Sequence, residues 1–197
     1  EVMERLGTTR DVFRRALLWG SLWESVRELQ LDPRKYIELA VKLLPAETDE
    51  SLASGILAHV TTALHRYVSD ETRLQVAPDV ERLAAEQMTE SADLNLRIVW
   101  FRALQGVAET PLGLGQLKHL LDERMWVPGV ELRPLDRWNM ITTLIALHDP
   151  EAADVFNQER QRDQSGDARK YAYAALAARP DPGSKAEYFE QYLRTDS

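Results

Sequence analysis

Apolar residues recur at helical spacing along nearly the whole chain, most densely between Arg14 and Leu29. Two apolar stripes lie side by side in this stretch. They comprise Phe13, Ala16, Leu17 and Gly20, and Trp19, Leu22, Trp23, Val26 and Leu29. Spacings of three and four residues are typical of a helix, and two adjacent stripes indicate burial over a wide arc. We therefore expect an inner helix in which Gly20 meets another helix closely, since glycine in mid-helix costs about 1 kcal/mol relative to alanine.

A second inner helix is expected after Asp93, in the segment LNLRIVWFRALQGVAE. Its apolar residues again cover most of the helix circumference, which predicts burial on more than one side. We place Trp23 and Trp100 on the two inner helices and expect both side chains to be largely buried. All five tryptophans are interpreted as core residues rather than as a ligand cage.

Capping residues and prolines predict where the other helices begin and end. Asp32-Pro33, Thr110-Pro111 and Asp149-Pro150 each place a capping residue before a proline at the first helical position. Pro78 is expected to interrupt the fourth helical region, because proline lacks an amide hydrogen. The segment WVPGVELRP indicates a loop with some extended structure. The predicted helical hairpins cover residues 9–44, 48–88, 93–124, 135–161 and 168–194.

Ten predicted helices, short connections and no convincing strand indicate an all-α protein. A hairpin period of about 40 residues falls in the range of HEAT and armadillo repeats, although no residue-level repeat pattern accompanies it. The first prediction is an irregular α-α superhelix of HEAT/armadillo-like hairpins, forming a single helical-repeat domain over residues 1–197. The second prediction for the fold is a globular helical bundle.

Charge and composition narrow the possible partners. The net charge is −8, and residues 47–95 carry three basic and ten acidic side chains. No basic stripe could neutralise phosphates, which argues against nucleic-acid binding, and the acidic segment is interpreted as a solvated face. The chain has no cysteine, no apolar run of membrane-spanning length, and a first segment too charged for a signal peptide. These features favour a cytoplasmic protein without a membrane partner.

No residue is assigned to catalysis, to a cofactor, to a metal or to substrate binding. A His-Glu-x-x-His motif does not occur, and the four histidines are interpreted as surface or core residues; they are His59, His65, His119 and His148. Gly113-Leu114-Gly115 is too short for a phosphate loop and lacks the lysine. Carboxylate pairs such as Asp49 and Glu50 lie at expected helix starts, where capping explains them.

Three stretches together resemble a known family. Residues 14–49, RRALLWGSLWESVRELQLDPRKYIELAVKLLPAETD, are similar to a segment of the C-terminal helical domain of bacterial aminopeptidase N. Residues 126–163, from WVPGVELRP to QERQRD, resemble a later part of that domain, including its Val-Pro-Gly loop. Residues 175–193, ALAARPDPGSKAEYFEQYL, resemble its closing helix pair. The family comprises zinc aminopeptidases and includes the antigen-trimming enzymes of the endoplasmic reticulum.

The resemblance implies a non-catalytic domain that sits over a catalytic domain, encloses the substrate cavity and gates peptide access. Neither the family's zinc motif nor its Gly-x-Met-Glu-Asn segment occurs in this chain. Zinc and catalysis are therefore expected in the parent enzyme only, and this chain alone is expected to be inactive. It is expected to be a C-terminal fragment of a longer protein, with the catalytic domain and peptides as partners. The alternative is a free-standing HEAT-like scaffold for protein–protein interaction.

Overall fold

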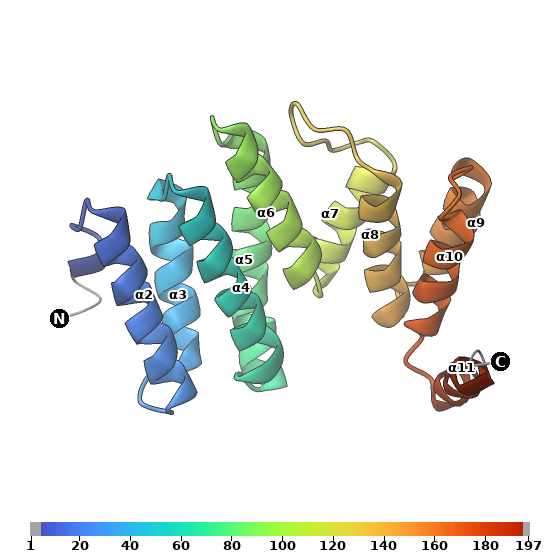
Figure 1. Ribbon diagram of the computed structural model, residues 1–197, viewed down its shortest axis with the longest axis horizontal. Coiled ribbons are helices and arrows are strands. Elements are labelled where there is room, and N and C mark those ends of the chain that lie inside the picture. The colour runs from blue at the N-terminus through green and yellow to red at the C-terminus, as the bar shows by residue number, and fades with distance from the viewer. Residues whose placement is uncertain (1–4, 195–197) are drawn as a thin grey trace. The chain divides into compact units, whose positions relative to one another are not determined.

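A computed structural model describes residues 5–194, and ten α-helices lie within them with no strand. The all-α prediction and the number of helices are confirmed, whereas the superhelical arrangement stays a prediction. Figure 1 shows the helices. They are α2 (Val12–Arg27), α3 (Pro33–Leu43), α4 (Glu50–Arg66), α5 (Asp70–Glu90), α6 (Leu94–Val107), α7 (Pro111–Leu121), α8 (Pro134–Ala146), α9 (Ala152–Arg162), α10 (Ala168–Ala177) and α11 (Pro182–Arg194).

Contacts divide the chain into two compact units. The first comprises Glu1–Gln116 and Trp126–Val130, and the second comprises Leu117–Met125 and Glu131–Ser197. In the first unit α6 packs on α4 and α5, and α3 packs on α4 and α5 as well. In the second unit α8 packs on both α9 and α10. Helices thus contact both the next helix and the one after it, as neighbouring hairpins do in helical repeat proteins.

The starts of α3, α4 and α6 follow the predicted capping residues, whereas α9 begins at Ala152, three residues after the predicted cap Asp149. Asp11, Asp32, Asp49 and Asp93 each accept a hydrogen bond from a backbone amide of the first turn that follows. These bonds satisfy amides that have no partner within the helix.

The predicted break at Pro78 is wrong, because α5 continues through it from Asp70 to Glu90. An internal proline costs about 3 kcal/mol. The residues on either side of Pro78 belong to the buried face of α5; they are Val76, Ala77, Val80 and Leu83. Packing of this face against α3 and α6 therefore outweighs the lost backbone hydrogen bond.

The Val-Pro-Gly segment forms a loop rather than extended strand. Arg97 on α6 holds it, because one guanidinium nitrogen donates to the Pro128 carbonyl at 2.9 Å. Gly129 follows with a φ of +82°, a conformation that side chains disfavour. The neighbouring Trp126 is 66% exposed, so the expectation that all five tryptophans are core residues is wrong for this one. The other four are buried.

Candidate functional site

The inner face of α2 is packed by aromatic rings. Trp19 meets Tyr36 of α3 edge to face, with ring centroids 5.4 Å apart. Trp23 stacks on His59 of α4 at 4.4 Å and 6°. Burial lowers the pKa of His59 below its usual value, which favours the neutral ring in this apolar setting. Trp23 and Trp100 are both buried, as predicted.

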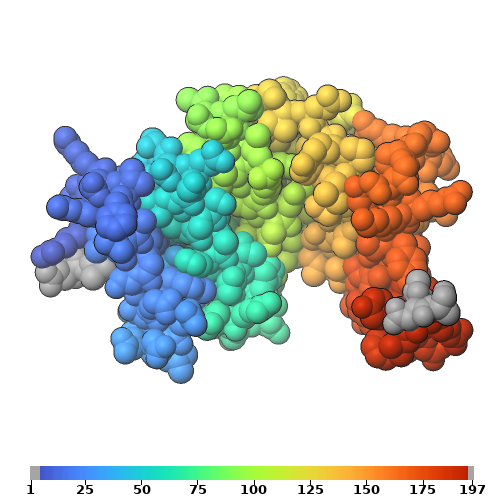
Figure 2. All heavy atoms as spheres, viewed as in Figure 1, coloured from blue at the N-terminus to red at the C-terminus, as the bar shows by residue number. Residues whose placement is uncertain are grey.

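The outer face of α2 has no packing partner among residues 5–194, contrary to the predicted inner helix. Phe13 is 72% exposed and Leu17 is 58% exposed, and they lie one turn apart. A Cβ atom added at Gly20 would meet nothing within 4 Å, so the predicted close helix contact at this glycine is wrong. α2 packs on α3 and α4 with its opposite face. In Figure 2 its atoms form the edge of the first unit.

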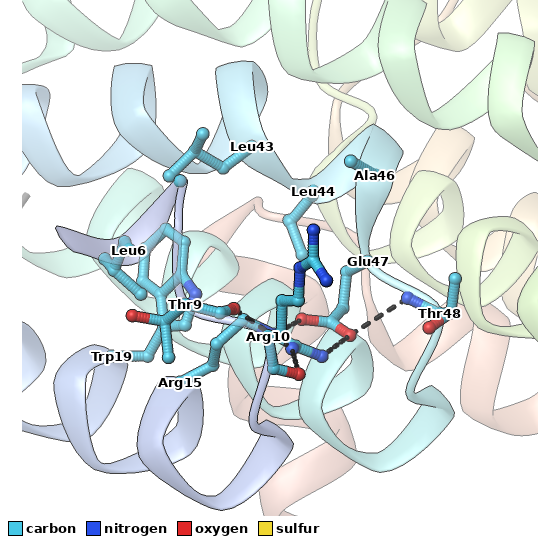
Figure 3. A pocket seen from close by; sticks show the side chains of 11 residues that line it. Leu6, Thr9, Arg10, Arg15, Trp19, Leu43, Leu44, Ala46, Glu47 and Thr48 are labelled. Atoms are coloured by element: carbon cyan, nitrogen blue, oxygen red, sulfur yellow. Dashed lines mark hydrogen bonds and ion pairs between the residues drawn. The ribbon is translucent and has the colours of Figure 1, made fainter. Parts of the chain in front are cut away.

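A pocket of about 340 Å³ lies beside α2 and contains a largely buried ion pair. Figure 3 shows the Arg15 and Glu47 side chains meeting there, with Leu6, Trp19 and Leu44 around them. Arg15 donates to both carboxylate oxygens of Glu47, at 2.8 and 2.7 Å. The pair fixes α2 to the segment that precedes α4.

The Glu47 carboxylate also accepts hydrogen bonds from the amides of Thr48 and Asp49, each at 2.9 Å. Burial raises the pKa of Glu47, but the hydrogen bonds from Arg15 and the two amides outweigh it, so the pKa lies below its ordinary value. A carboxylate held ionised by so many donors is suited to structure rather than to proton transfer.

A second buried carboxylate organises the turn between α6 and α7. Glu81 of α5 is fully buried and accepts from the amides of Glu109, Thr110 and Gly113 at 2.8, 2.9 and 3.1 Å. The Thr110 hydroxyl donates to it as well. A Cβ atom at Gly113 would lie 2.5 Å from a Glu81 oxygen, so only glycine fits here. The expected solvated acidic face therefore does not include Glu81, which caps α7 from another helix.

Next to this turn, Glu109 lies between two basic side chains. Arg73 pairs with its carboxylate at 2.9 Å, and His65 lies 3.8 Å away. Burial raises the pKa of Glu109, and the charges of Arg73 and His65 only partly oppose that effect. This cluster links α4, α5 and the α6–α7 turn.

The described residues do not fit a zinc ion. No group of three or more His, Asp or Glu side chains within residues 5–194 lies close enough together to hold a metal. His59 is stacked on Trp23, and the Nε2 atom of His65 is 2.9 Å from the Gly106 carbonyl oxygen. The absence of catalytic and metal-binding residues from this chain nevertheless stays a prediction, as does the assignment of zinc to the parent enzyme.

Sequence reasoning missed the structural roles of Glu47 and Glu81. Glu81 is one of ten acidic residues in the segment 47–95, and its spacing does not distinguish it from its exposed neighbours. Thr110-Pro111 did predict the start of α7, whose amides needed an acceptor. The acceptor comes from a different helix. Such a contact between distant parts of the chain cannot be predicted from the local sequence pattern.

Within residues 5–194, Glu47 and Glu81 accept hydrogen bonds from backbone amides of the first unit, and Phe13 and Leu17 leave one apolar face of α2 exposed. The chain belongs to the family of ERAP1-like C-terminal domains, whose family model matches residues 2–197. It is 28% identical over 196 residues to an aminopeptidase N of Streptomyces lividans. The match covers 99% of this chain and 23% of that protein, so the chain spans about a quarter of its relative's length. The family resemblance is thereby confirmed.

None of the helices within residues 5–194 is long and apolar enough to cross a membrane.

Proposed function

We propose that this chain is a non-catalytic C-terminal domain of a zinc aminopeptidase that removes N-terminal residues from peptides. The family match over residues 2–197 is the observation that carries the proposal. The relative named aminopeptidase N is about four times longer than the matched segment, which leaves room for a catalytic domain in the same polypeptide. In this proposal the zinc belongs to that domain, the whole of residues 1–197 acts as one domain, and the enzyme is cytoplasmic.

The outer face of α2 is the surface through which we propose that the chain joins the rest of the polypeptide. Phe13 and Leu17 form an exposed apolar stripe on α2. The small residues Ala16 and Gly20 belong to the same stripe. Contiguous exposed apolar residues of this kind mark interaction sites. Another segment of the same polypeptide is the occupant that we favour, because in the relative the matching segment, 28% identical, is part of one longer polypeptide.

In the assembled enzyme the helices would enclose the substrate cavity and limit which peptides reach the zinc. Removing residues 1–197 from the full enzyme should then change the preference among peptides of different length more than it changes turnover of a small amino-acid amide. The isolated chain should show neither tightly bound zinc nor aminopeptidase activity. Metal analysis and a peptide-length series test these expectations.

Zinc-dependent activity of the isolated chain would overturn the proposal. An unchanged length profile in the truncated enzyme would leave only a structural role. If the chain is instead produced alone, without a catalytic domain upstream, the alternative of a HEAT-like scaffold holds, and the α2 face would then dock a separate protein.

A further inference from the structure

Gly20 lies in the middle of α2, and no contact within residues 5–194 accounts for a glycine there. Glycine destabilises the interior of a helix relative to alanine, and close approach of another backbone is its usual compensation. A Cβ atom added at Gly20 would meet nothing within 4 Å, so no described residue makes that approach. The compensation is therefore expected from a part of the polypeptide outside residues 5–194.

Gly55 of α4 is a mid-helix glycine with the same open space, yet its surroundings differ. One turn away on either side lie Ser51 and Ala58, which are small and exposed. One turn before Gly20 lies Leu17, which is 58% exposed. The open space beside Gly20 therefore borders an apolar surface that gains free energy from burial, whereas the space beside Gly55 does not.

Two opposite charges flank the apolar stripe of α2 on one side. Arg14, Ser21 and Glu28 follow one another at intervals of seven residues, which is close to two helical turns, and all three are exposed. Within residues 5–194 neither the Arg14 nor the Glu28 side chain forms an ion pair. The outer face thus has an unpaired positive charge near the start of α2 and an unpaired negative charge at its end.

We propose that a helix from elsewhere in the polypeptide packs along the outer face of α2 and crosses it at Gly20. Its apolar side chains cover Phe13 and Leu17, a carboxylate lies opposite Arg14, and a basic side chain lies opposite Glu28. A helix fits this face because a glycine at the crossing point lets two helix axes approach to about 8 Å. The inference rests on the proposed function, since it takes the partner from the same polypeptide as the proposed catalytic domain.

A second copy of the chain is the less favoured partner. An antiparallel α2 of that copy would also bring Glu28 opposite Arg14. Stable interfaces between separate proteins, however, bury about 800 Å² on each partner, more than a single helix face with two large apolar side chains offers. A helix of the same polypeptide needs less contact area, because the covalent connection keeps its effective concentration high.

Hydrogen–deuterium exchange of the α2 amides, measured for Gly20→Leu in this chain alone and in the full-length protein, tests the proposal. In the chain alone leucine should leave exchange unchanged or slow it, because it favours the helix and has open space. In the full-length protein it should speed exchange at least about fivefold, since leucine overpacks the crossing helix. Gly55→Leu is the matched control, and its effect on the α4 amides should be the same in both proteins.

Charge reversal gives a milder variant in case Gly20→Leu prevents folding of the full-length protein. Arg14→Glu should speed α2 exchange by up to about fivefold in the full-length protein at low salt, and less at high salt. In the chain alone it should have no such effect, because Arg14 has no ion pair there to lose.

Equal effects of Gly20→Leu in the two proteins would overturn the inference, as would equal effects of Arg14→Glu. If α2 is protected in the full-length protein but responds to neither variant, the inference fails while the proposed attachment through α2 stands. If the full-length protein has no aminopeptidase activity but both variants act as expected, the proposed function fails and the helix contact stands. Protection of α2 that rises with protein concentration, together with a dimer by light scattering, would identify a second copy as the partner and overturn the inference.

Discussion

α2 and α6 have the same kind of apolar pattern, yet they differ in how much of their apolar surface is buried. Trp100 and Leu104 of α6 are almost completely buried, because α4 and α5 both pack on this helix. On α2 the stripe around Trp19 is buried, while Phe13 and Leu17 of the other stripe are exposed. Both helices lie in the first unit, so the difference is one of available partners (Figure 1).

The comparison shows that an apolar pattern indicates which faces of a helix are suited to burial. It does not show whether this stretch of chain contains the helices that would bury them. For α6 both partners lie within residues 5–194, and pattern and structure agree. For α2 only one face is satisfied by α3 and α4. We infer that the unsatisfied face of α2 is the surface that meets the rest of the protein.

The largest effect should follow from emptying the core at α6. Trp100→Ala should reduce the free energy of unfolding by about 3–5 kcal/mol, through lost burial and a cavity. Phe13→Ala, the matched truncation on the outer face of α2, should change the stability of this chain by less than about 0.5 kcal/mol, as exposed positions do. Urea unfolding of both variants measures the difference. Equal losses of unfolding free energy in the two variants would contradict the proposed difference between α2 and α6.

The turn that follows α6 should be the next most sensitive site. Glu81→Ala removes the acceptor of three backbone amides and a hydroxyl, and should cost about 2–3 kcal/mol. Glu86→Ala on the same helix is the control, because Glu86 is exposed. The two melting temperatures should differ clearly; coincident melting curves would show that Glu81 does not anchor α7.

The attachment of α2 through Arg15 and Glu47 should depend on pH. Glu47→Gln should cost about 1–2 kcal/mol at pH 7. Because the folded-state pKa of Glu47 lies below the ordinary value of 4.5, its stabilisation is present above that value and is lost as the pH falls through the folded-state pKa. The difference in unfolding free energy between parent and variant should therefore shrink between pH 7 and pH 3. Glu90→Gln, at an exposed position, should show no such trend.

The smallest expected effect is a gain in stability. Gly20→Ala should stabilise this chain by up to about 1 kcal/mol, since alanine favours the helix and the new methyl group meets nothing within 4 Å. Gly113→Ala provides the contrast, because its methyl group would clash with Glu81. A destabilised Gly20→Ala variant would show that this chain already covers the outer face of α2.

Much of the fold could be predicted from sequence, because capping and periodicity are local. Asp32 and Asp93 cap the helices that they were expected to start. The break at Pro78 was predicted wrongly, because tertiary packing along α5 outweighs a local penalty. Gly20 was misinterpreted for a related reason: its helix pattern cannot reveal whether a partner is present. The Glu81 site depends on a contact between residues 28 to 32 positions apart, which no local pattern predicts.

Hydroxyl-radical footprinting of Phe13 and Leu17 tests the central claim most directly, by comparing this chain alone with the full-length protein. In the chain alone both side chains should react readily, while the buried Trp100 stays protected as an internal reference. In the full-length protein the account predicts that Phe13 and Leu17 become protected, because the rest of the polypeptide covers the outer face of α2. Equal reactivity of both residues in the two proteins would contradict it.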